Sequence, residues 1–169
     1  MTAKGRIAIA AALLATGIAH TAQAADISGT IANTLTIFED SRLIGDVTCT
    51  VVGAPCIAFG APGVTLKLNG FTMTGRANLQ TPCATAGNGE VGIDVNMQSD
   101  DVILGPGIVQ GFRQFGIRLR AATGVTVKRV TANSNCASGI FVTLASSENN
   151  IEQNTAVRNG HPTNPCGGI

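Results

Sequence analysis

The chain of 169 residues contains no tryptophan, no tyrosine and only two histidines, and charged residues make up 12% of it. The absence of Trp and Tyr excludes the usual ring platforms of sugar-binding faces. A histidine-based metal site or a Ser-His-Asp set would have only His20 and His161 to draw on. The net charge is +1, so the basic surplus that nucleic-acid binding requires is also missing.

Positions 1–24 have the pattern of a secretory signal peptide. Lys4 and Arg6 precede an uncharged apolar run, Ile7–Ala19, and Ala22–Ala24 places small residues at a cleavage point. The run is shorter than the roughly 20 residues that span a bilayer, so we expect no stable membrane span. The protein is expected to be exported, to the periplasm or the extracellular space. The mature chain would begin at Ala25 with a net charge of −1, because both basic residues of the signal peptide are removed, and His20 would be lost with them.

One short phrase returns three times, and its isoleucines stand at the nearly evenly spaced positions 93, 117 and 140. The copies are Gly92-Ile93-Asp94-Val95, Gly116-Ile117-Arg118-Leu119 and Gly139-Ile140-Phe141-Val142. Two further columns keep the same step, one through Leu104, Val127 and Ile151 and the other through Val109, Ala132 and Ala156. Such repetition is typical of a solenoid, in which each coil buries its apolar face against its neighbours.

The periodic segments are short, alternate apolar with polar residues and end at Gly or Asn, which favours strands over helices. Each coil, of about 23–24 residues, is expected to hold three short strands separated by turns, about 4.8 Å from the strands of the next coil. The predicted fold is therefore all-β, a parallel β-helix that forms one domain over residues 25–169.

Three segments resemble the right-handed parallel β-helix proteins of the pectin-lyase-like superfamily, and among them the bacterial β-helix repeat proteins. The segments are Gly63–Gly75, Asp101–Phe112 and Asn149–Thr155. The resemblance extends from roughly Leu43 to Ile169 and implies a right-handed coil. It does not select a function, because the superfamily contains polysaccharide lyases, hydrolases, epimerases, accessory proteins and adhesins.

All five cysteines follow the predicted signal peptide, and an exported chain with this many is expected to form disulfides. Cys136 and Cys166 each come just before a Gly-Ile phrase, so they should occupy similar places in adjacent coils, and we favour a bond between them. Cys56 with Cys83 is the second predicted pair, and Cys49 with Cys56 is its rival. The odd count leaves one thiol over. A metal cluster is a weaker interpretation, because no Cys-x-x-Cys is present.

Strand alternation predicts that Asp94 and Arg118 are neighbours on an outer face, if the repeated isoleucines point inward. One interpretation is an exposed ion pair worth some tenths of a kcal/mol. The other is catalytic, because enzymes that this chain resembles place carboxylates with a basic residue or a calcium ion on such a face. Asp100 and Asp101 are further candidates, although they are expected to favour the turn before Val102. Neither the hydrolase nor the lyase pattern of aspartates is recognisable.

The same alternation predicts whether other side chains point inward or outward. Lys128 and Glu152 should lie side by side on the outside of the second sheet, and Phe141 should point outward whereas Phe59 points inward. Several asparagines are expected to stack their amides in the turns and to satisfy backbone groups there. They are Asn133, Asn135, Asn154 and Asn159.

Two insertions interrupt the period, one at Arg76–Glu90 and one at residues 160–165. The closing segment, Cys166–Ile169, has the pattern of the opening of another coil. Since a solenoid needs a polar cap, we expect the sequence to be part of a longer protein. The uncapped end would then allow end-to-end self-association.

Two functions fit these observations. The first is an exported, noncatalytic β-helix scaffold or binding module without a cofactor, whose partner is a polysaccharide or a surface protein. The second is the N-terminal part of a polysaccharide lyase or glycoside hydrolase that acts on acidic polysaccharide, with calcium as its one expected cofactor. We favour the first because no catalytic site is recognisable, and the sequence leaves open whether the protein is an enzyme.

Overall fold

The computed structural model describes residues 24–79, 88–160 and 167–169. Within these ranges the chain forms strands and no helix, which confirms the all-β prediction. In the same ranges no helix is long and apolar enough to cross a membrane. The predicted signal peptide lies, apart from its last residue, outside the described residues.

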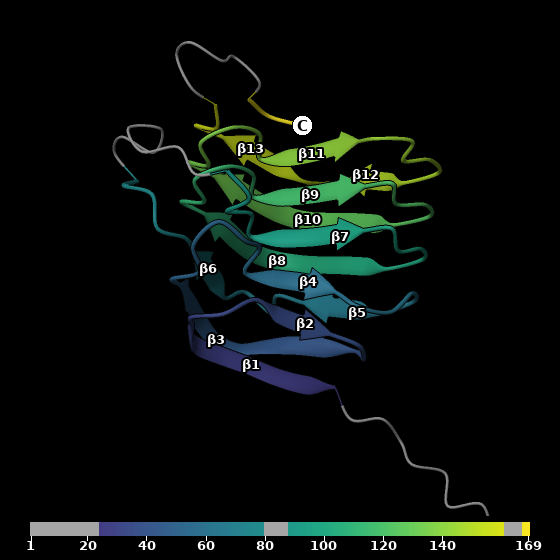
Figure 1. The fold of residues 1–169 in the computed structure, drawn as a ribbon, viewed down its shortest axis with the longest axis horizontal. Helices are drawn as coiled ribbons and strands as arrows, with labels where there is room; N and C mark the ends of the chain where they lie inside the picture. Colours follow the sequence, from purple (N-terminus) through teal and green to yellow (C-terminus); the bar gives the residue numbers. More distant parts are fainter. Residues whose placement is uncertain (1–23, 80–87, 161–166) are drawn as a thin grey trace, which may run out of the picture.

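The strands form two parallel sheets that the chain visits alternately (Figure 1). The larger sheet has the order β1-β3-β5-β8-β10-β12, with β6 beside β3 and β8, and β13 beside β10. Its strands are β1 (Ala25–Ile31), β3 (Ser41–Cys49), β5 (Thr65–Lys67), β6 (Thr72–Thr74), β8 (Val102–Gln110), β10 (Thr126–Asn133), β12 (Asn150–Glu152) and β13 (Thr155–Val157).

The second sheet has five strands in the order β11-β9-β7-β4-β2. They are β2 (Leu35–Ile37), β4 (Ile57–Phe59), β7 (Ile93–Asn96), β9 (Ile117–Arg120) and β11 (Ile140–Thr143). We call one passage through both sheets a coil. Successive coils lie one above another along the stack (Figure 1), an arrangement compatible with a β-helix.

The repeated phrase sets the register of the five-stranded sheet. Ile57 pairs with Ile93, Ile93 with Ile117 and Ile117 with Ile140, as the spacing predicts. The column through Val109, Ala132 and Ala156 is likewise confirmed in the larger sheet. The longer step between Ile57 and Ile93 does not disturb the register. The first insertion is therefore accommodated outside the stacked strands.

The prediction for the remaining column is wrong by one residue. Val127 pairs with Ile103 and Ile151, while Leu104 pairs with Lys128. Ile103 is fully buried and Leu104 only partly so. Three apolar residues follow one another here, and a period that itself varies by one residue cannot choose between the last two. Because successive side chains alternate, an error of one residue exchanges the inside for the outside.

Three strands per coil occur where β4 is followed by β5 and β6, and where β11 is followed by β12 and β13. In other coils the two short strands of the larger sheet merge into one long strand. Such a strand is β10, whose register against β8 shifts between Lys128 and Val130. The prediction of three short strands is therefore correct for some coils, and in the others a local irregularity replaces the turn.

The core is a continuous apolar column between the two sheets. Isoleucine, leucine and valine side chains from every coil fill it, and many of them are completely buried. Phe59 is 5% exposed, as its predicted inward direction requires. Stability thus comes from stacking one apolar layer on the next.

Asparagine side chains join successive coils at the turns. Asn149 accepts a hydrogen bond from the amide N–H of Val125 at 2.8 Å through Oδ1 and donates to the carbonyl of Ala122 at 3.0 Å through Nδ2. Three other asparagines make the same two contacts, each to one N–H and to the carbonyl three residues before it. They are Asn135, Asn154 and Asn159. We call this arrangement the asparagine bracket.

The predicted role of the turn amides is therefore confirmed at three of the four positions. Asn133 differs, because its Nδ2 donates to the side chain of Gln110, and its Oδ1 accepts from Ser134 and Arg158.

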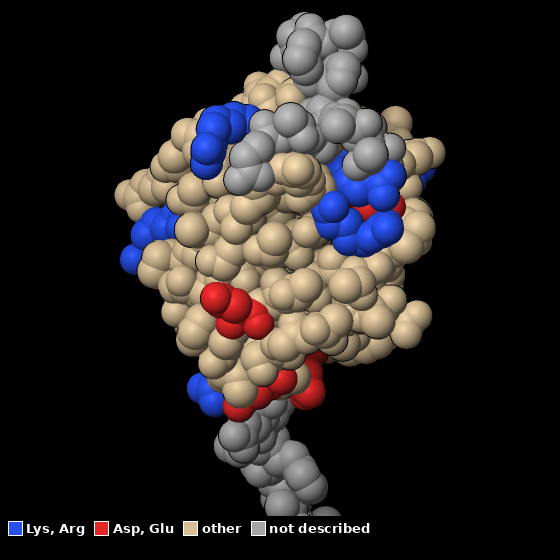
Figure 2. Space-filling view, turned by 90° about the vertical axis from the view of Figure 1, so that its left-hand side faces the viewer, with Lys and Arg blue, Asp and Glu red and all other residues tan. Residues whose placement is uncertain are grey.

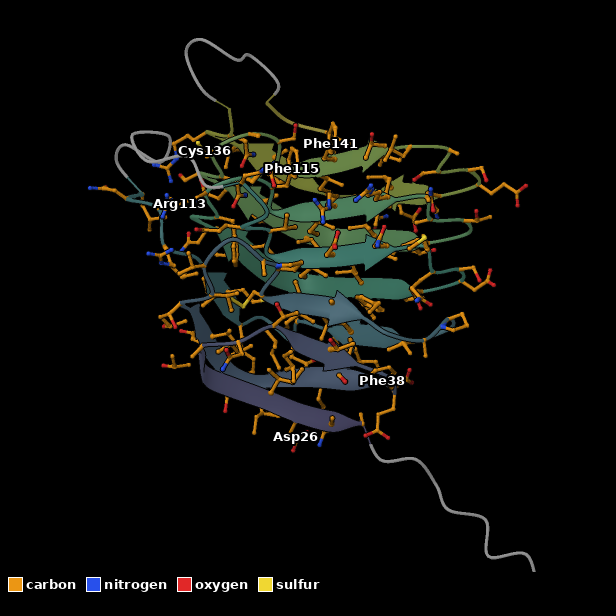
Figure 3. All side chains as sticks on the ribbon, in the orientation of Figure 1. Asp26, Phe38, Arg113, Phe115, Cys136 and Phe141 are labelled. Atoms are coloured by element: carbon orange, nitrogen blue, oxygen red, sulfur yellow. A yellow bond between two sulfur atoms is a disulfide. The ribbon has the colours of Figure 1, made fainter. Side chains whose placement is uncertain are left out.

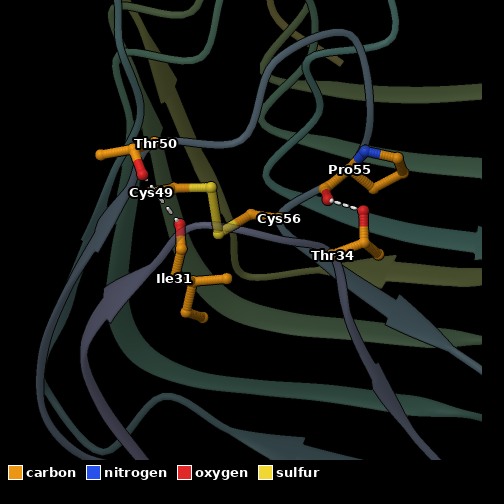
Figure 4. The surroundings of a disulfide bond; sticks show 6 residues. All are labelled: Ile31, Thr34, Cys49, Thr50, Pro55 and Cys56. Carbon is orange, nitrogen blue, oxygen red and sulfur yellow. Dashed lines mark hydrogen bonds between the residues drawn. A yellow bond between two sulfur atoms is a disulfide. The ribbon is translucent and has the colours of Figure 1, made fainter.

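A disulfide links Cys49, at the end of β3, to Cys56, just before β4, with a Cα–Cα distance of 5.9 Å (Figure 4). The predicted Cys56–Cys83 pair is wrong, because Cys56 is already bonded within its own turn. The rival pair is the correct one. Hydrogen bonds from Thr34 to the carbonyl of Pro55 and from Thr50 to that of Ile31 hold the surrounding segments together.

Cys136 is buried near the turn before β11. Its predicted partner Cys166 lies outside the described residues, as does Cys83. The Cys136–Cys166 bond therefore stays a prediction.

Replacement of Asn135 by alanine tests the bracket. Asn135 is fully buried, and its loss would leave the N–H of Phe112 and the carbonyl of Val109 without their partner. We expect a loss of about 2–4 kcal/mol in the free energy of unfolding, measured by urea denaturation. Asn33→Ala, at an exposed asparagine between β1 and β2, is the control and should change stability little. Equal effects of the two changes would refute the role of the bracket.

The double substitution of Cys49 and Cys56 by serine tests the disulfide. The bond closes a short loop, with a sequence separation of 7, and its loss should lower the free energy of unfolding by about 2 kcal/mol. Mass spectrometry after alkylation of the unreduced protein should place the bond between these two cysteines. A mass that shows both of them alkylated would contradict the assignment.

Candidate functional site

The outer face of the five-stranded sheet carries the candidate residues predicted from sequence. One outward column runs through Thr36, Ala58, Asp94, Arg118 and Phe141, each paired with the next in register. Parallel in-register pairing places such side chains directly above one another, about 4.8 Å apart. A second outward column, two residues further along, contains Asn96, Arg120 and Thr143.

Asp94 and Arg118 form a bidentate ion pair. Nε and Nη2 of Arg118 donate to the two carboxylate oxygens of Asp94 at 2.7 and 2.8 Å. The predicted contact is confirmed, but the pair is not exposed, because 8% of the Asp94 side chain and 18% of the Arg118 side chain are accessible. The hydrogen bond from Arg118 to Asp94, together with the charge of Asp94, raises the pKa of the Arg118 guanidinium, and burial opposes this rise.

An aromatic pair extends this column. The rings of Phe115 and Phe141 are stacked, with centroids 4.4 Å apart and planes inclined by 8°. Phe141 points outward as predicted and is partly exposed. Phe115 lies in the connection between β8 and β9, and both rings lie over the upper strands in Figure 3.

A second ionic cluster lies beside this face. Oε1 of Glu90 is 3.1 Å from Nη1 of Arg76 and 3.5 Å from Nη1 of Arg113, and it accepts from the N–H of Gly53 at 3.4 Å. Only 6% of the Glu90 side chain is exposed, against 33% for Arg76 and 20% for Arg113. The cluster carries one net positive charge.

This cluster ties the first insertion to the stack. The N–H of Gly89 donates to the side chain of Gln114 at 2.8 Å, and the N–H of Gln114 donates to the carbonyl of Glu90 at 3.1 Å. Arg113 lies on the left-hand side of Figure 3, and that side faces the viewer in Figure 2, where basic side chains surround an acidic one. Contacts with three segments therefore hold Glu90 in place, and its carboxylate in turn contacts the two arginines.

No pattern in the sequence points to the Glu90 cluster. Its three members come from the insertion and from the next turn, and they share no period. The stacking of Phe115 on Phe141 was missed for a related reason, since one ring comes from a turn and the other from a strand of the next coil.

Asp100 and Asp101 lie away from this face, in the turn between β7 and β8. Asp100 is exposed and has a φ of 60°, as expected for a residue that favours a turn. Asp101 is completely buried, and burial raises its pKa to about 6. Among the described residues, neither of them forms a hydrogen bond or an ion pair with Asp94 or Arg118, so the structure does not unite the four candidates in one site.

The remaining predicted pair, Lys128 with Glu152, is confirmed at 2.6 Å on the outside of the larger sheet. Both side chains are about one-third exposed. Pairs of this kind contribute little to stability, and we assign it no function.

A calcium ion would need six to eight oxygen ligands. Within the described residues no three His, Cys, Asp or Glu side chains are grouped so that they could hold a metal ion. Both oxygens of Asp94 already accept from Arg118. The described residues therefore do not fit calcium.

The first coil offers another surface feature. A hollow of about 340 Å³ lies between β1 and β2, where Phe38 is 67% exposed. Its apolar lining comes mainly from Ile27, Leu35 and Ile37. Phe38 and Asp26 are at the opposite end of the stack from the aromatic pair (Figure 3).

Comparison with known proteins adds no relative. No protein-family model, curated protein or solved structure matches this chain. The class that the fold defines is therefore that of all-β proteins with stacked parallel strands.

The difference in burial between two ion pairs gives a test. Asp94→Ala would leave the guanidinium of Arg118 partly buried without its partner, and we expect a loss of about 2–3 kcal/mol in the free energy of unfolding. Asp26→Ala removes the partner of Arg42 in a pair that is 42–43% exposed and should have a clearly smaller effect. In the Asp94→Ala/Arg118→Ala double variant, part of the loss should be recovered. Equal losses at both aspartates would contradict this description.

Proposed function

We propose that the protein is an exported right-handed parallel β-helix domain of the pectin-lyase-like kind that binds polysaccharide without catalysis. The parallel coils and their register support the β-helix. The right hand is supported by the resemblance of the repeated segments and by the strong preference of parallel crossover connections for that hand. Export is supported by the N-terminal pattern and is compatible with the Cys49–Cys56 bond.

The observation that carries the binding proposal is the stacked pair of Phe115 and Phe141 on the outer sheet face. Partly exposed aromatic rings offer an apolar surface to the C–H groups of a sugar ring. Asn96, Arg120 and Thr143 form the polar column beside Phe141 and supply hydrogen-bonding groups. A glycan chain that lies across the upper coils would contact both columns.

The lack of catalysis is inferred from the state of Asp94. A general base must have a lone pair that can reach the proton it removes. Both oxygens of Asp94 accept hydrogen bonds from one guanidinium, and the side chain is buried. This carboxylate is therefore suited to holding Arg118 in place, and poorly suited to proton transfer.

The alternative is the N-terminal part of a polysaccharide lyase or glycoside hydrolase that acts on acidic polysaccharide. The positive charge around Glu90 and the exposed Arg120 favour a ligand that carries carboxylates. This alternative needs catalytic residues in addition to those described.

Affinity measurements on a panel of neutral and acidic polysaccharides test the proposal. The mature protein should bind at least one of them, and Phe141→Ala should weaken binding roughly three- to tenfold, because it removes one ring of the stack. Phe38→Ala is the matched control, since it removes an exposed ring at the opposite end of the stack, and it should leave the affinity unchanged. Failure to bind any polysaccharide would refute the proposal and direct the search to a protein partner.

The same panel separates binding from catalysis. We expect neither new reducing ends nor unsaturated products from any polysaccharide, with or without added calcium. Turnover that disappears in Asp94→Asn would overturn the noncatalytic proposal and identify an enzyme.

A further inference from the structure

A buried aspartate occupies a position of the kind that asparagine occupies in other turns. Oδ1 of Asp101 accepts from the N–H of Val64 at 2.9 Å, the contact that Asn149 makes to Val125 at 2.8 Å two coils further on. Val64, Asp101, Val125 and Asn149 are equivalent positions in four successive coils.

The backbone confirms that these are the same turn. The residue before each of these four positions has a left-handed φ, a backbone conformation that residues other than glycine rarely adopt. The values are 73° for Gly63, 60° for Asp100, 69° for Gly124 and 57° for Glu148.

Aspartate differs from asparagine in the second bracket contact, in which Nδ2 of asparagine is the donor. In every asparagine bracket Nδ2 donates to the carbonyl three residues before the bonded N–H, as Asn149 does to Ala122. For Asp101 the corresponding carbonyl is that of Ala61, but Oδ2 of an ionised carboxylate has no proton to donate. This oxygen is buried and has no hydrogen-bond partner.

We infer that in mildly acidic solution Asp101 is a neutral carboxylic acid whose Oδ2–H donates to the carbonyl of Ala61, so that the contact between these two coils depends on a proton. Protonation takes up one proton from solvent and forms the O–H bond that completes the bracket. Loss of that proton leaves two acceptors facing each other without water, which is costly for both. The inference stands apart from glycan binding, because this turn is not part of the proposed face.

The surroundings of Asp101 support the neutral form. The turns packed against it from either side, residues 61–64 and 122–125, contain no side chain that titrates. Asp100, in its own turn, is the charged group that acts on it, and its negative charge raises the pKa of Asp101 further. Burial is the largest cause of the rise of the pKa to about 6, and the backbone hydrogen bonds from Val64 and Gly63 oppose it.

The raised pKa fixes how the stability of the folded protein changes with pH. The pKa of Asp101 is higher in the folded protein than the ordinary 3.8. The folded state therefore gains stability from protonation, fully below pH 3.8, and loses this gain as the pH rises through about 6. The loss corresponds to a decrease in the folding equilibrium constant of up to on the order of a hundredfold.

Asp101→Asn tests the inference, because a carboxamide supplies the missing donor at every pH. In urea denaturation of the full chain at about pH 8, we expect the variant to fold with an equilibrium constant up to on the order of a hundredfold larger than that of the wild type. At about pH 4 the two proteins should be nearly equal. Lower stability of Asp101→Asn at the higher pH would overturn the inference.

Two further measurements make the test independent of that variant. Carbon-13 NMR of the aspartate carboxyls in the wild type should show one group that titrates near pH 6, and a pKa at or below the ordinary value for Asp101 would refute the inference even if Asp101→Asn fails to fold. Asn135→Asp, at a bracket that is equally buried, should introduce a new loss of stability with rising pH. Asp100→Asn is the control: it should lower the pKa of Asp101, because it removes a neighbouring negative charge, but Asp101 should still titrate above its ordinary value.

Discussion

Parallel hydrogen bonding between coils is the constraint on which the rest of the structure depends. Each strand finds its partner about one coil away in sequence, and this register decides which side chains meet. Asp94 contacts Arg118 only because Ile93 pairs with Ile117. The apolar column, the ion pairs and the outward polar columns are all consequences of one repeated alignment. A shift of one residue would exchange the core for the surface along a whole strand.

The strand register alone does not satisfy the backbone N–H and carbonyl groups of the turns, because these groups have no partner in a neighbouring strand. The asparagine bracket solves this problem by pairing one N–H and one carbonyl of the preceding coil with a single side chain. Its two contacts are three residues apart on the coil they bind, and they do not depend on how many residues lie between the coils. At Asp101 the Oδ1 contact spans 37 positions rather than the 24 seen at Asn149. The Oδ1 contact is therefore compatible with the long insertion between these coils.

The features that repeat could be predicted from the sequence. The isoleucine columns, the Asp94–Arg118 contact and the turn amides all follow from the repeat period and from the alternation of side chains along strands. Features that depend on a single local choice could not be derived in this way. Ile103 rather than Leu104 points inward because the turn at Asp101 fixes the start of β8, and the period cannot detect a shift of one residue. The partner of Cys56 is a cysteine of its own turn, although the stacking argument favoured another coil.

The candidate site likewise has one part that could be predicted from the repeat and another that could not. Its ionic part lies in the regular strands and was predictable, whereas its aromatic part and the Glu90 cluster involve an insertion and a turn. A regular stack by itself presents the same kind of surface at every level, so a ligand would have little reason to prefer one level to another. Phe115 and Arg113, from the turn before β9, and Arg76, from the insertion, break this uniformity because none of them belongs to the repeated strands. The proposed polysaccharide binding is therefore expected where side chains from turns and from the insertion meet the regular strands, and the buried pair of Asp94 and Arg118 lies in the same outward column as Phe141.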